Sequence, residues 1–426
     1  MDELKKSITL WKGIALAVCI VIGSGLLGLP GLTLEIGNVY ASAGGWMLIT
    51  IVIIPLIYIF ASLGYRFVSS AGLSKYAEEA VGAWGKHAVS AVLCGTFTIG
   101  IPGIALIGGA YTQKLFGLAD ASVFWLAAVI LIAATLSNLL GVKVVNVINT
   151  SSLIALIVMV LIIILSNIPF LLKGITVFGE TLLGRVDINP SDLWKIAALL
   201  FWAFLGWENL SFSLEEFKNP EKNIPRVYWF SFIIVIFLYF GLTITSVGAQ
   251  ASGLSVRGAS GLTSLITRTP IGFFQLIIMV LVIPANASAW IFGGSRLFYA
   301  SGRDGILPSL FAKLSKDGVP LYGLILSCFV YIVVLYVTYI FQIPLSNLVL
   351  LVSQNFLVLY LFSIFAYWKT EKRKRRWLVS LMALGSCGFL LSGFSWWIIY
   401  PLLLLSLGYL SYYRTRNGIF NVKIEK

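Results

Sequence analysis

Long apolar segments alternate with short polar connections along almost the whole chain. A helical bilayer span needs about 20 consecutive apolar residues, and the sequence offers twelve candidate segments. They lie at residues 11–36, 43–66, 87–112, 121–140, 145–170, 193–217, 226–249, 271–300, 320–341, 345–368, 378–393 and 395–413. The last two are short, so we expect ten long spans and a final shorter pair. The pattern predicts an all-α membrane protein with twelve transmembrane helices.

The polar connections are too short to form a soluble domain. Residues 69–80, between the second and third spans, predict a short amphipathic helix. Residues 171–192 join the fifth and sixth spans, and residues 250–270 join the seventh and eighth.

The first span is interrupted near its centre by Gly23, Ser24 and Gly25. A broken helix leaves backbone N–H groups without intrahelical partners, which hydrocarbon tolerates only where protein or a water-filled cavity covers them. Transporters bind small charged solutes at breaks of this kind. The interruption therefore predicts a binding site, although the same glycines would also allow close helix packing without one.

The sixth span carries a matching interruption at Gly206, followed by Glu208 and Asn209. The two breaks lie five spans apart, and because five is odd, the second set of five spans crosses the membrane in the opposite sense. Matching interrupted helices in two halves indicate an inverted-repeat transporter. We therefore predict a first repeat at residues 1–170, a second at 171–370, and a peripheral part at 371–426.

The two breaks have opposite polarity. The start of the second half-helix would offer the N–H groups of Ser24, Gly25 and Leu26, with the Ser24 hydroxyl, to a carboxylate. The predicted substrate-binding residues are Gly23, Ser24, Gly25, Leu26, Trp202, Ala203, Leu205, Gly206 and Trp290.

In the sixth span, the carbonyl groups near Trp202, Ala203 and Leu205 would accept hydrogen bonds from an ammonium group. A ligand that carries a carboxylate and an ammonium group on one carbon is an α-amino acid. The paired breaks therefore favour a small amino acid as the substrate.

Glu208 is a carboxylate at bilayer depth, where insertion costs about 2.5–3.5 kcal/mol and a functional role is the default. Three roles stay open: a proton carrier for coupling, a structural acceptor that ties spans together, and a direct contact to a cationic substrate. Among the nearby aromatic residues, Trp202, Phe204 and Trp290 are the candidate gates.

Composition agrees with a membrane protein, because 59% of the 426 residues are hydrophobic and 11% are charged, against about 25% charged in soluble domains. The net charge of +13 does not indicate nucleic acid, because the cations follow the positive-inside rule. With a cytoplasmic N-terminus, only six of the 30 Lys and Arg residues fall outside: Lys114, Lys173, Arg185, Lys195, Arg257 and Arg268. We expect a multi-pass protein of the cytoplasmic membrane with both termini in the cytoplasm.

The densest basic run, residues 369–376, is a topology signal with anionic-lipid contact. The four cysteines are dispersed and lack ligand spacing, so we expect no metal site, no cofactor and no enzymatic activity.

The motifs resemble the amino acid–polyamine–organocation (APC) superfamily. The resemblance is carried by Gly23-Ser24-Gly25 with Pro30, by Gly206-Trp207-Glu208, and by the longer signatures at residues 215–226 and 295–308. Residues 99–103 and the sixth span look most like bacterial exporters of methionine and branched-chain amino acids.

This resemblance implies a five-plus-five inverted-repeat fold of the leucine-transporter type with two peripheral helices. It assigns the carboxylate to Ser24 and Gly25, the amino group to carbonyls near Trp202 and Leu205, and gating to Trp202. Trp290 falls where similar arginine-exchanging members have a substrate-facing tryptophan.

Two departures narrow the expected substrate. Residues 151–157 lack the fifth-span lysine of proton-coupled cationic amino acid transporters, and apolar Ile20 replaces a first-span asparagine of the arginine exchanger. We predict a secondary active transporter, working as a monomer or homodimer by alternating access, for neutral amino acids such as methionine, leucine, isoleucine and valine. The alternatives are a cationic amino acid or polyamine exchanger, and a non-transporting receptor or partner-dependent membrane subunit.

Overall fold

A computed structural model describes residues 6, 8–69, 72–140, 142–303, 305–315, 319–392 and 396–417. Within these ranges helices are the regular elements, and the one extended pairing is an isolated parallel bridge between Ile8 and Phe217. The α-helices are α1 (Leu10–Val21), α2 (Ser24–Ile36), α3 (Val39–Arg66), α4 (Leu73–Val81), α5 (Ala83–Phe116), α6 (Ser122–Leu139), α7 (Val142–Ser166), α8 (Ile168–Leu182), α9 (Pro190–Leu200), α10 (Trp207–Leu210), α11 (Pro220–Ala251), α12 (Thr263–Ile266), α13 (Gly272–Arg303), α14 (Leu321–Ile340), α15 (Leu345–Thr370), α16 (Arg375–Leu391) and α17 (Ile399–Arg416). The 3₁₀ helices are η1 (Phe201–Phe204), η2 (Ser211–Glu216), η3 (Ser309–Ala312) and η4 (Trp396–Ile398).

Eight of the described helices are long and apolar enough to cross a membrane: α3, α5, α6, α7, α11, α13, α14 and α15. The bent pair α1 and α2 would make a ninth span. The sixth expected span is present as the short pieces α9, η1, α10 and η2, and the last two expected spans as α16 and α17, of 17 and 18 residues. The prediction of an all-helical, multi-pass membrane protein is confirmed.

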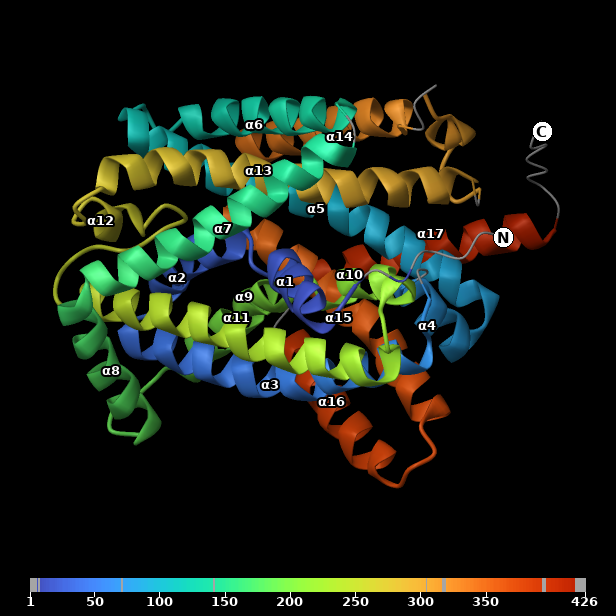
Figure 1. The fold of residues 1–426 in the computed structure, drawn as a ribbon, viewed down its shortest axis with the longest axis horizontal. Helices are drawn as coiled ribbons and strands as arrows, with labels where there is room; N and C mark the ends of the chain where they lie inside the picture. The colour runs from blue at the N-terminus through green and yellow to red at the C-terminus, as the bar shows by residue number, and fades with distance from the viewer. Residues whose placement is uncertain are drawn as a thin grey trace.

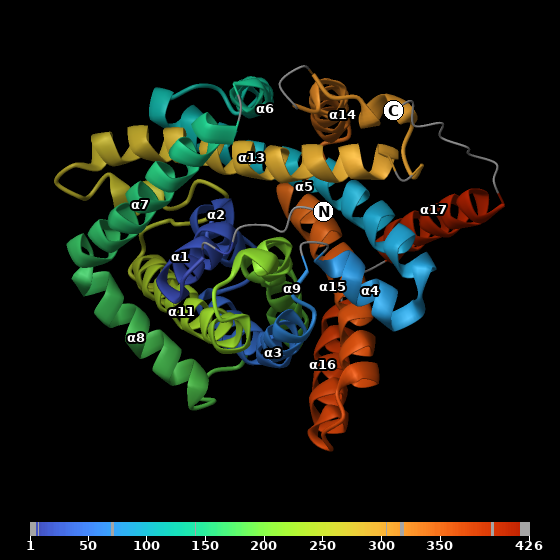
Figure 2. The same cartoon turned by 45° about the vertical axis from the view of Figure 1, so that its right-hand side comes forward.

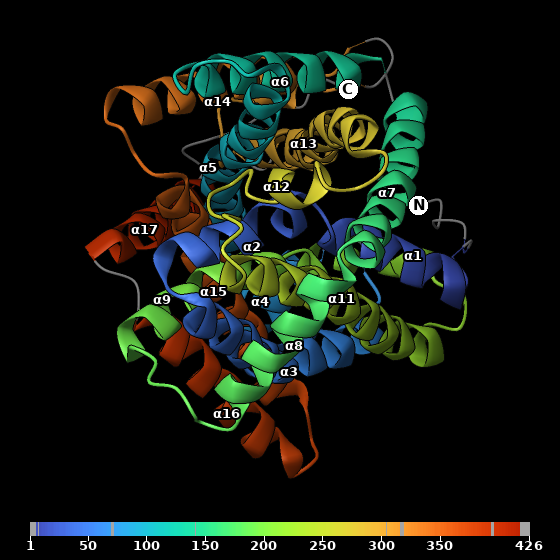
Figure 3. The same ribbon diagram turned by 90° about the vertical axis from the view of Figure 1, so that its left-hand side faces the viewer.

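The pieces of the two interrupted spans lie in the middle of the bundle. In Figure 1, α1, α2, α9 and α10 lie between α13 and the long helix α3. In all three views, α6 and α14 form one edge and α16 forms the opposite edge (Figures 2 and 3). Helices α8 and α12 lie at one end of the bundle, and α4 and α17 lie at the other (Figure 1).

The connection expected at residues 171–192 contains a helix, α8, that packs across α11. Glycines make this packing possible: a side chain at Gly174 would collide with the carbonyl of Ile244, and one at Gly248 with the carbonyl of Phe170. The short amphipathic helix expected at residues 69–80 is confirmed as α4, which buries Leu73 on its inner face.

The start of the first span, which we expect on the cytoplasmic side, is joined to the end of the sixth span. The Ile8 N–H donates to the carbonyl of Glu216 at 2.9 Å, and the Lys218 N–H donates to the carbonyl of Ile8 at 2.9 Å. Gly13 completes this contact, because a Cβ there would lie 2.6 Å from the Phe217 ring. Backbone and packing thus connect α1 to the segment that follows η2.

Candidate functional site

The first span breaks where α1 ends at Val21 and α2 begins at Ser24, with a bend of 41° between the two helices. Ile22 is extended, and Gly23 follows it with φ −144° and ψ −145°. A Cβ at Gly23 would lie 2.6 Å from the Asn286 Nδ2 atom of α13, so a side chain there would displace this amide. The Ser24 side chain lies outside the described part of the chain, and the backbone of Ser24 begins α2.

The sixth span breaks at Gly206, where η1 gives way to α10. Leu205 is extended, and Gly206 has φ +119°, a conformation that glycine adopts without strain. A Cβ at Gly206 would also lie 3.1 Å from the carbonyl oxygen of Ile20 and 3.1 Å from the Cα of Val21. The break in the first span and the break in the sixth span, which have opposite predicted polarity, therefore contact each other.

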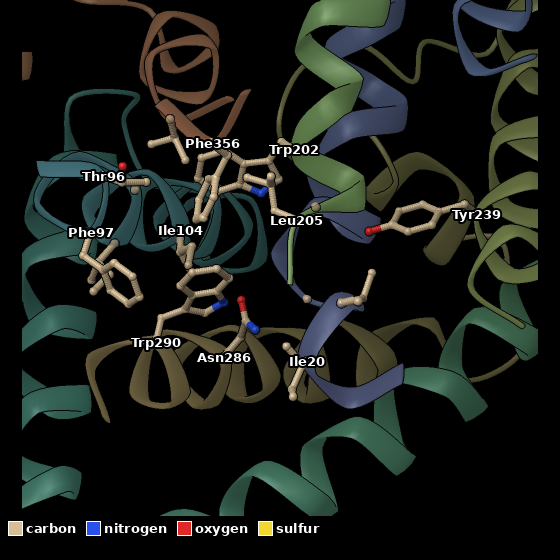
Figure 4. Close-up of a pocket in the computed structure, with 16 residues that line it drawn as sticks. Ile20, Thr96, Phe97, Ile104, Trp202, Leu205, Tyr239, Asn286, Trp290 and Phe356 are labelled. Atoms are coloured by element: carbon tan, nitrogen blue, oxygen red, sulfur yellow. The ribbon is translucent and has the colours of Figure 1, made fainter. Parts of the chain in front are cut away.

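A cavity lies beside the two breaks, and the space between atoms there is about 470 Å³ when the adjoining open space is counted. Figure 4 shows side chains from α1, α5, η1, α11, α13 and α15 around it. Its lining is mainly apolar, with small polar groups at a few positions. The lining residues are Ile20, Val21, Gly23, Gly25, Thr96, Phe97, Gly100, Ile101, Ile104, Trp202, Leu205, Tyr239, Asn286, Trp290, Val352 and Phe356.

Five of the predicted site residues line this cavity: Gly23, Gly25, Trp202, Leu205 and Trp290. The others lie around it without lining it. Apart from Ser24, these are Leu26, Ala203, Phe204 and Gly206, all in the adjoining backbone segments, and Glu208 two residues after Gly206.

Hydrogen-bond donors gather near the start of α2. The Leu26 N–H is used locally, because it donates to the carbonyl of Gly23 at 3.1 Å. The first N–H groups of a helix have no intrahelical acceptor, which leaves Ser24 and Gly25 as the backbone donors. Tyr239 adds a phenol hydroxyl: a Cβ at Gly25 would lie 3.4 Å from that oxygen.

The Tyr239 side chain is fully buried and lines the cavity. Its hydroxyl has no hydrogen-bond partner among the described residues. A buried hydroxyl without a partner is unfavourable, so a ligand that accepts from it would gain a hydrogen bond. With the helix start, this hydroxyl provides a setting suited to a carboxylate.

Carbonyl groups lie on the other side, where η1 ends. The carbonyl of Trp202 accepts from the Leu205 N–H at 3.2 Å and keeps a second lone pair for another donor. Ala203 is buried within η1. This end of the cavity is suited to an ammonium group.

The contacts of Glu208 are those of a structural acceptor. Its side chain is fully buried; Oε1 accepts from the Gly206 N–H at 2.9 Å, and Oε2 accepts from the Tyr360 hydroxyl at 2.7 Å. The Ser211 hydroxyl also donates to the Glu208 carbonyl. Glu208 therefore ties the broken sixth span to α15, and of its three predicted roles this is the one that the hydrogen bonds favour.

The three candidate gating aromatics have different surroundings. Trp202 projects toward α5, where a Cβ at Gly100 or Gly103 would lie 3.8 or 3.6 Å from its ring. Trp290 packs against Phe97 with ring centroids 5.4 Å apart, and both Trp202 and Trp290 point into the cavity (Figure 4). Phe204 does not line the cavity and packs against Phe232 and Tyr239 of α11.

Sequence reasoning did not assign several lining residues to the site. They come from helices without a break: Thr96, Phe97 and Ile104 of α5, Tyr239 of α11, Asn286 of α13, and Val352 and Phe356 of α15. The only sequence signals were the glycines of residues 99–103 and the amide of Asn286 in an otherwise apolar helix.

The fifth span faces the first break, as the resemblance implies. A second cavity brings Ser152, Leu153 and Leu156 of α7 together with Ile22 and Gly23. Hydroxyl, amide and aliphatic groups of α7, the amide being that of Asn149, therefore occupy the neighbourhood in which the resemblance places a lysine in proton-coupled cationic transporters.

A helical membrane protein with two touching helix breaks beside a small, mainly apolar cavity belongs to the class of solute transporters. The breaks supply donors and acceptors, and the described lining supplies no nucleophile paired with a base. A family model for amino acid permeases matches residues 8–419. The chain belongs to this family, which is part of the APC superfamily, and it is a membrane transporter rather than an enzyme.

Two relatives span almost the full chain, and a third covers less of it. The uncharacterized amino acid permease YecA of Bacillus subtilis is 28% identical over 98% of this chain and 98% of its own length. The L-methionine/branched-chain amino acid exporter YjeH of Escherichia coli is 25% identical over 95% of this chain and 96% of its own length. The putrescine transporter PotE of E. coli is 24% identical over 72% of this chain and 70% of its own length.

Proposed function

We propose that the chain is a secondary active transporter of neutral hydrophobic amino acids, with methionine, leucine, isoleucine and valine as its substrates. The observation that carries the proposal is the cavity itself. It joins backbone donors at Gly25 to backbone acceptors at Trp202, and most of its remaining lining is aliphatic or aromatic.

In this proposal the carboxylate binds at Ser24 and Gly25, with Tyr239 as an additional donor. The ammonium group binds the carbonyls near Trp202, Ala203 and Leu205. The side chain of the substrate enters the apolar part of the cavity between α5 and α15, where no described lining residue carries a charge. The 25% identity to a methionine and branched-chain amino acid exporter supports the same substrate class.

The fold that accompanies this function has twelve spans, with residues 1–170 and 171–370 as inverted repeats and residues 371–426 as a peripheral part. Both termini lie in the cytoplasm. Trp202 and Trp290 close over the ligand during alternating access. Gly23, Leu26, Gly206 and Phe204 maintain the backbone and packing around them, and a proton is the candidate coupling ion.

The alternative function is a cationic amino acid or polyamine exchanger, which the 24% identity to a putrescine transporter favours. Such a substrate needs a carboxylate for its second positive charge. Glu208 is the buried acid nearest the break, and its oxygens already accept from Gly206 and Tyr360.

Counterflow in proteoliposomes tests the proposal. The purified chain is reconstituted, loaded with unlabelled amino acids, and supplied with a panel of labelled ones at two pH values. Accumulation of leucine or methionine is expected, whereas accumulation of arginine or putrescine alone would establish the alternative. Binding of leucine without flux would indicate a receptor, and absence of exchange for every amino acid would contradict transport.

A further inference from the structure

The turn between α15 and α16 presents a group of cations that the proposed function does not use. Residues 369–376 hold six cations and one acid: Lys369, Lys372, Arg373, Lys374, Arg375, Arg376 and Glu371. The turn lies beside α16, which forms one edge of the molecule in all three views (Figures 1 to 3).

Glu371, the one acid, is already neutralised. It is buried, and it forms an ion pair with Arg66 at the end of α3. It also accepts from the Arg373 N–H at 3.0 Å and lies 4.0 Å from the Arg375 guanidinium. Lys369 is also engaged, because its Nζ atom donates to the carbonyl of Glu79 at 2.9 Å.

Three cations remain unmatched at the tip of the turn. The side chains of Lys372, Arg373 and Lys374 are exposed. They have no acidic partner within the described part of the chain. Three adjacent positive charges on one short turn attract an anionic group, and the internal pairing of Glu371 keeps that acid from competing.

An aromatic and aliphatic surface adjoins these cations. The Arg376 guanidinium lies over the rings of Trp368 and Trp377, at 5.9 and 5.6 Å from their centroids. Trp377, Leu378 and Leu381, on the first turns of α16, are 61%, 62% and 69% exposed. Tryptophan with neighbouring basic residues is typical of a membrane–water interface.

We propose that this turn, defined by Lys372, Arg373 and Lys374 with Trp377, is a binding site for the headgroup of an anionic phospholipid. The cations contact the phosphate, while Trp377, Leu378 and Leu381 contact the glycerol and the first part of the acyl chains. The adjoining apolar surface favours a lipid over a soluble phosphate, because a soluble phosphate leaves that surface in water. Basic clusters directly beside a span bind anionic lipids in this way.

The test measures lipid binding directly and does not depend on transport. The full chain, purified in detergent micelles, is titrated with fluorescent phosphatidylglycerol, and unlabelled lipids compete for the site. Phosphatidylglycerol is expected to compete about tenfold better than phosphatidylcholine. Glycerol 3-phosphate, which has the phosphate without acyl chains, is expected not to compete.

The test variant is Lys372→Gln/Arg373→Gln/Lys374→Gln, with an expected loss of affinity of about tenfold or more. The matched control is Lys218→Gln/Lys222→Gln/Arg226→Gln, which removes the same charge from exposed positions near the start of α11. The control is expected to stay within about twofold of the wild type. The single variant Arg373→Gln replaces the triple variant if the latter does not fold.

Equal losses in the two triple variants would reduce the effect to net charge and overturn the proposal. Unchanged affinity in the turn variant would overturn it as well. Competition by glycerol 3-phosphate equal to that of phosphatidylglycerol would identify a soluble phosphate site instead. Because each readout is binding, failure of the proposed amino acid transport would leave these results intact.

Discussion

At the scale of single residues, small side chains determine the shape of the cavity. Gly100 lines the cavity, and a Cβ there would lie 3.3 Å from Val352 and 3.8 Å from the ring of Trp202. Gly103, one turn along α5, also faces Trp202 but does not line the cavity. Separate substitutions at Gly100 and Gly103 therefore distinguish a reduced cavity volume from a changed packing of Trp202.

Gly100→Ala is expected to discriminate against large substrates. The added methyl group occupies space between α5 and α15, so the apparent affinity for leucine and methionine should fall about tenfold while that for alanine changes little. Competition by each amino acid in the counterflow assay measures this. Gly103→Ala is the control, and an equal loss for leucine and alanine in Gly100→Ala would contradict a size limit at this position.

Tyr239→Phe is expected to weaken substrate binding without destabilising the protein. Loss of a hydrogen bond to a carboxylate should lower affinity about tenfold or more, whereas removal of an unpaired buried hydroxyl should leave the thermal midpoint unchanged or higher. Ligand binding and thermal unfolding in detergent measure the two effects. Tyr76→Phe is the control, since Tyr76 is also buried with an unpartnered hydroxyl but lies outside the cavity lining.

At the scale of elements, the interrupted spans show how far sequence reasoning extends. The glycines at both breaks, and the acid after the second, are visible in the sequence because they contradict a continuous apolar helix. The contact of Gly206 with Ile20 and Val21 is not visible there, because it joins distant segments. Phe97, Tyr239 and Phe356 were missed because an aromatic residue in an unbroken span looks the same whether it faces the core or a cavity.

Helix α8 was missed for a related reason. Residues 171–192 are predicted from the sequence as a connection between two spans, although α8 itself is mainly apolar. Its position depends on glycine contacts with α11, which join segments far apart in the sequence. The short final helices α16 and α17 were expected, since apolar length alone predicts them.

Glu208→Gln is expected to retain transport with the pH profile of the wild type. The glutamine oxygen can accept one of the two hydrogen bonds that hold the sixth span to α15. Glu208→Ala should lose about 2–3 kcal/mol of stability, because it leaves the Gly206 N–H and the Tyr360 hydroxyl unpaired. Counterflow at several pH values and thermal unfolding measure these effects, and a flattened pH profile in Glu208→Gln would instead establish a proton-carrying role.

At the scale of the whole molecule, an ion pair joins the ends of two distant helices. Arg66 at the end of α3 pairs with Glu371 at the end of α15. Burial works to raise the pKa of Glu371, but the Arg373 N–H and the Arg66 guanidinium outweigh it and hold that pKa below its ordinary value. A carboxyl with a depressed pKa stabilises the fold above its unfolded pKa, and this contribution is lost as the pH falls through the folded value.

Glu371→Gln should therefore lower the thermal midpoint at neutral pH by several degrees, an effect of about 2 kcal/mol, because Arg66 loses its charged partner. It should also reduce the fall in stability between neutral and acidic pH. Thermal unfolding across this range measures both changes. Glu78→Gln, in an exposed pair with Lys75, is the control and should change stability by less than about 1 kcal/mol; an equal effect of the two variants would contradict a special role for the buried pair.

The bridge between Ile8 and Phe217 links the start of the first span to the end of the sixth. Two backbone hydrogen bonds make this link independent of side-chain identity at residue 8. A movement of α1 alone would have to break both of these hydrogen bonds. A rotation in which α1 and η2 move together would break neither of them. The bridge therefore couples the start of the first interrupted span to the end of the sixth, so that a movement of one of these ends carries the other with it.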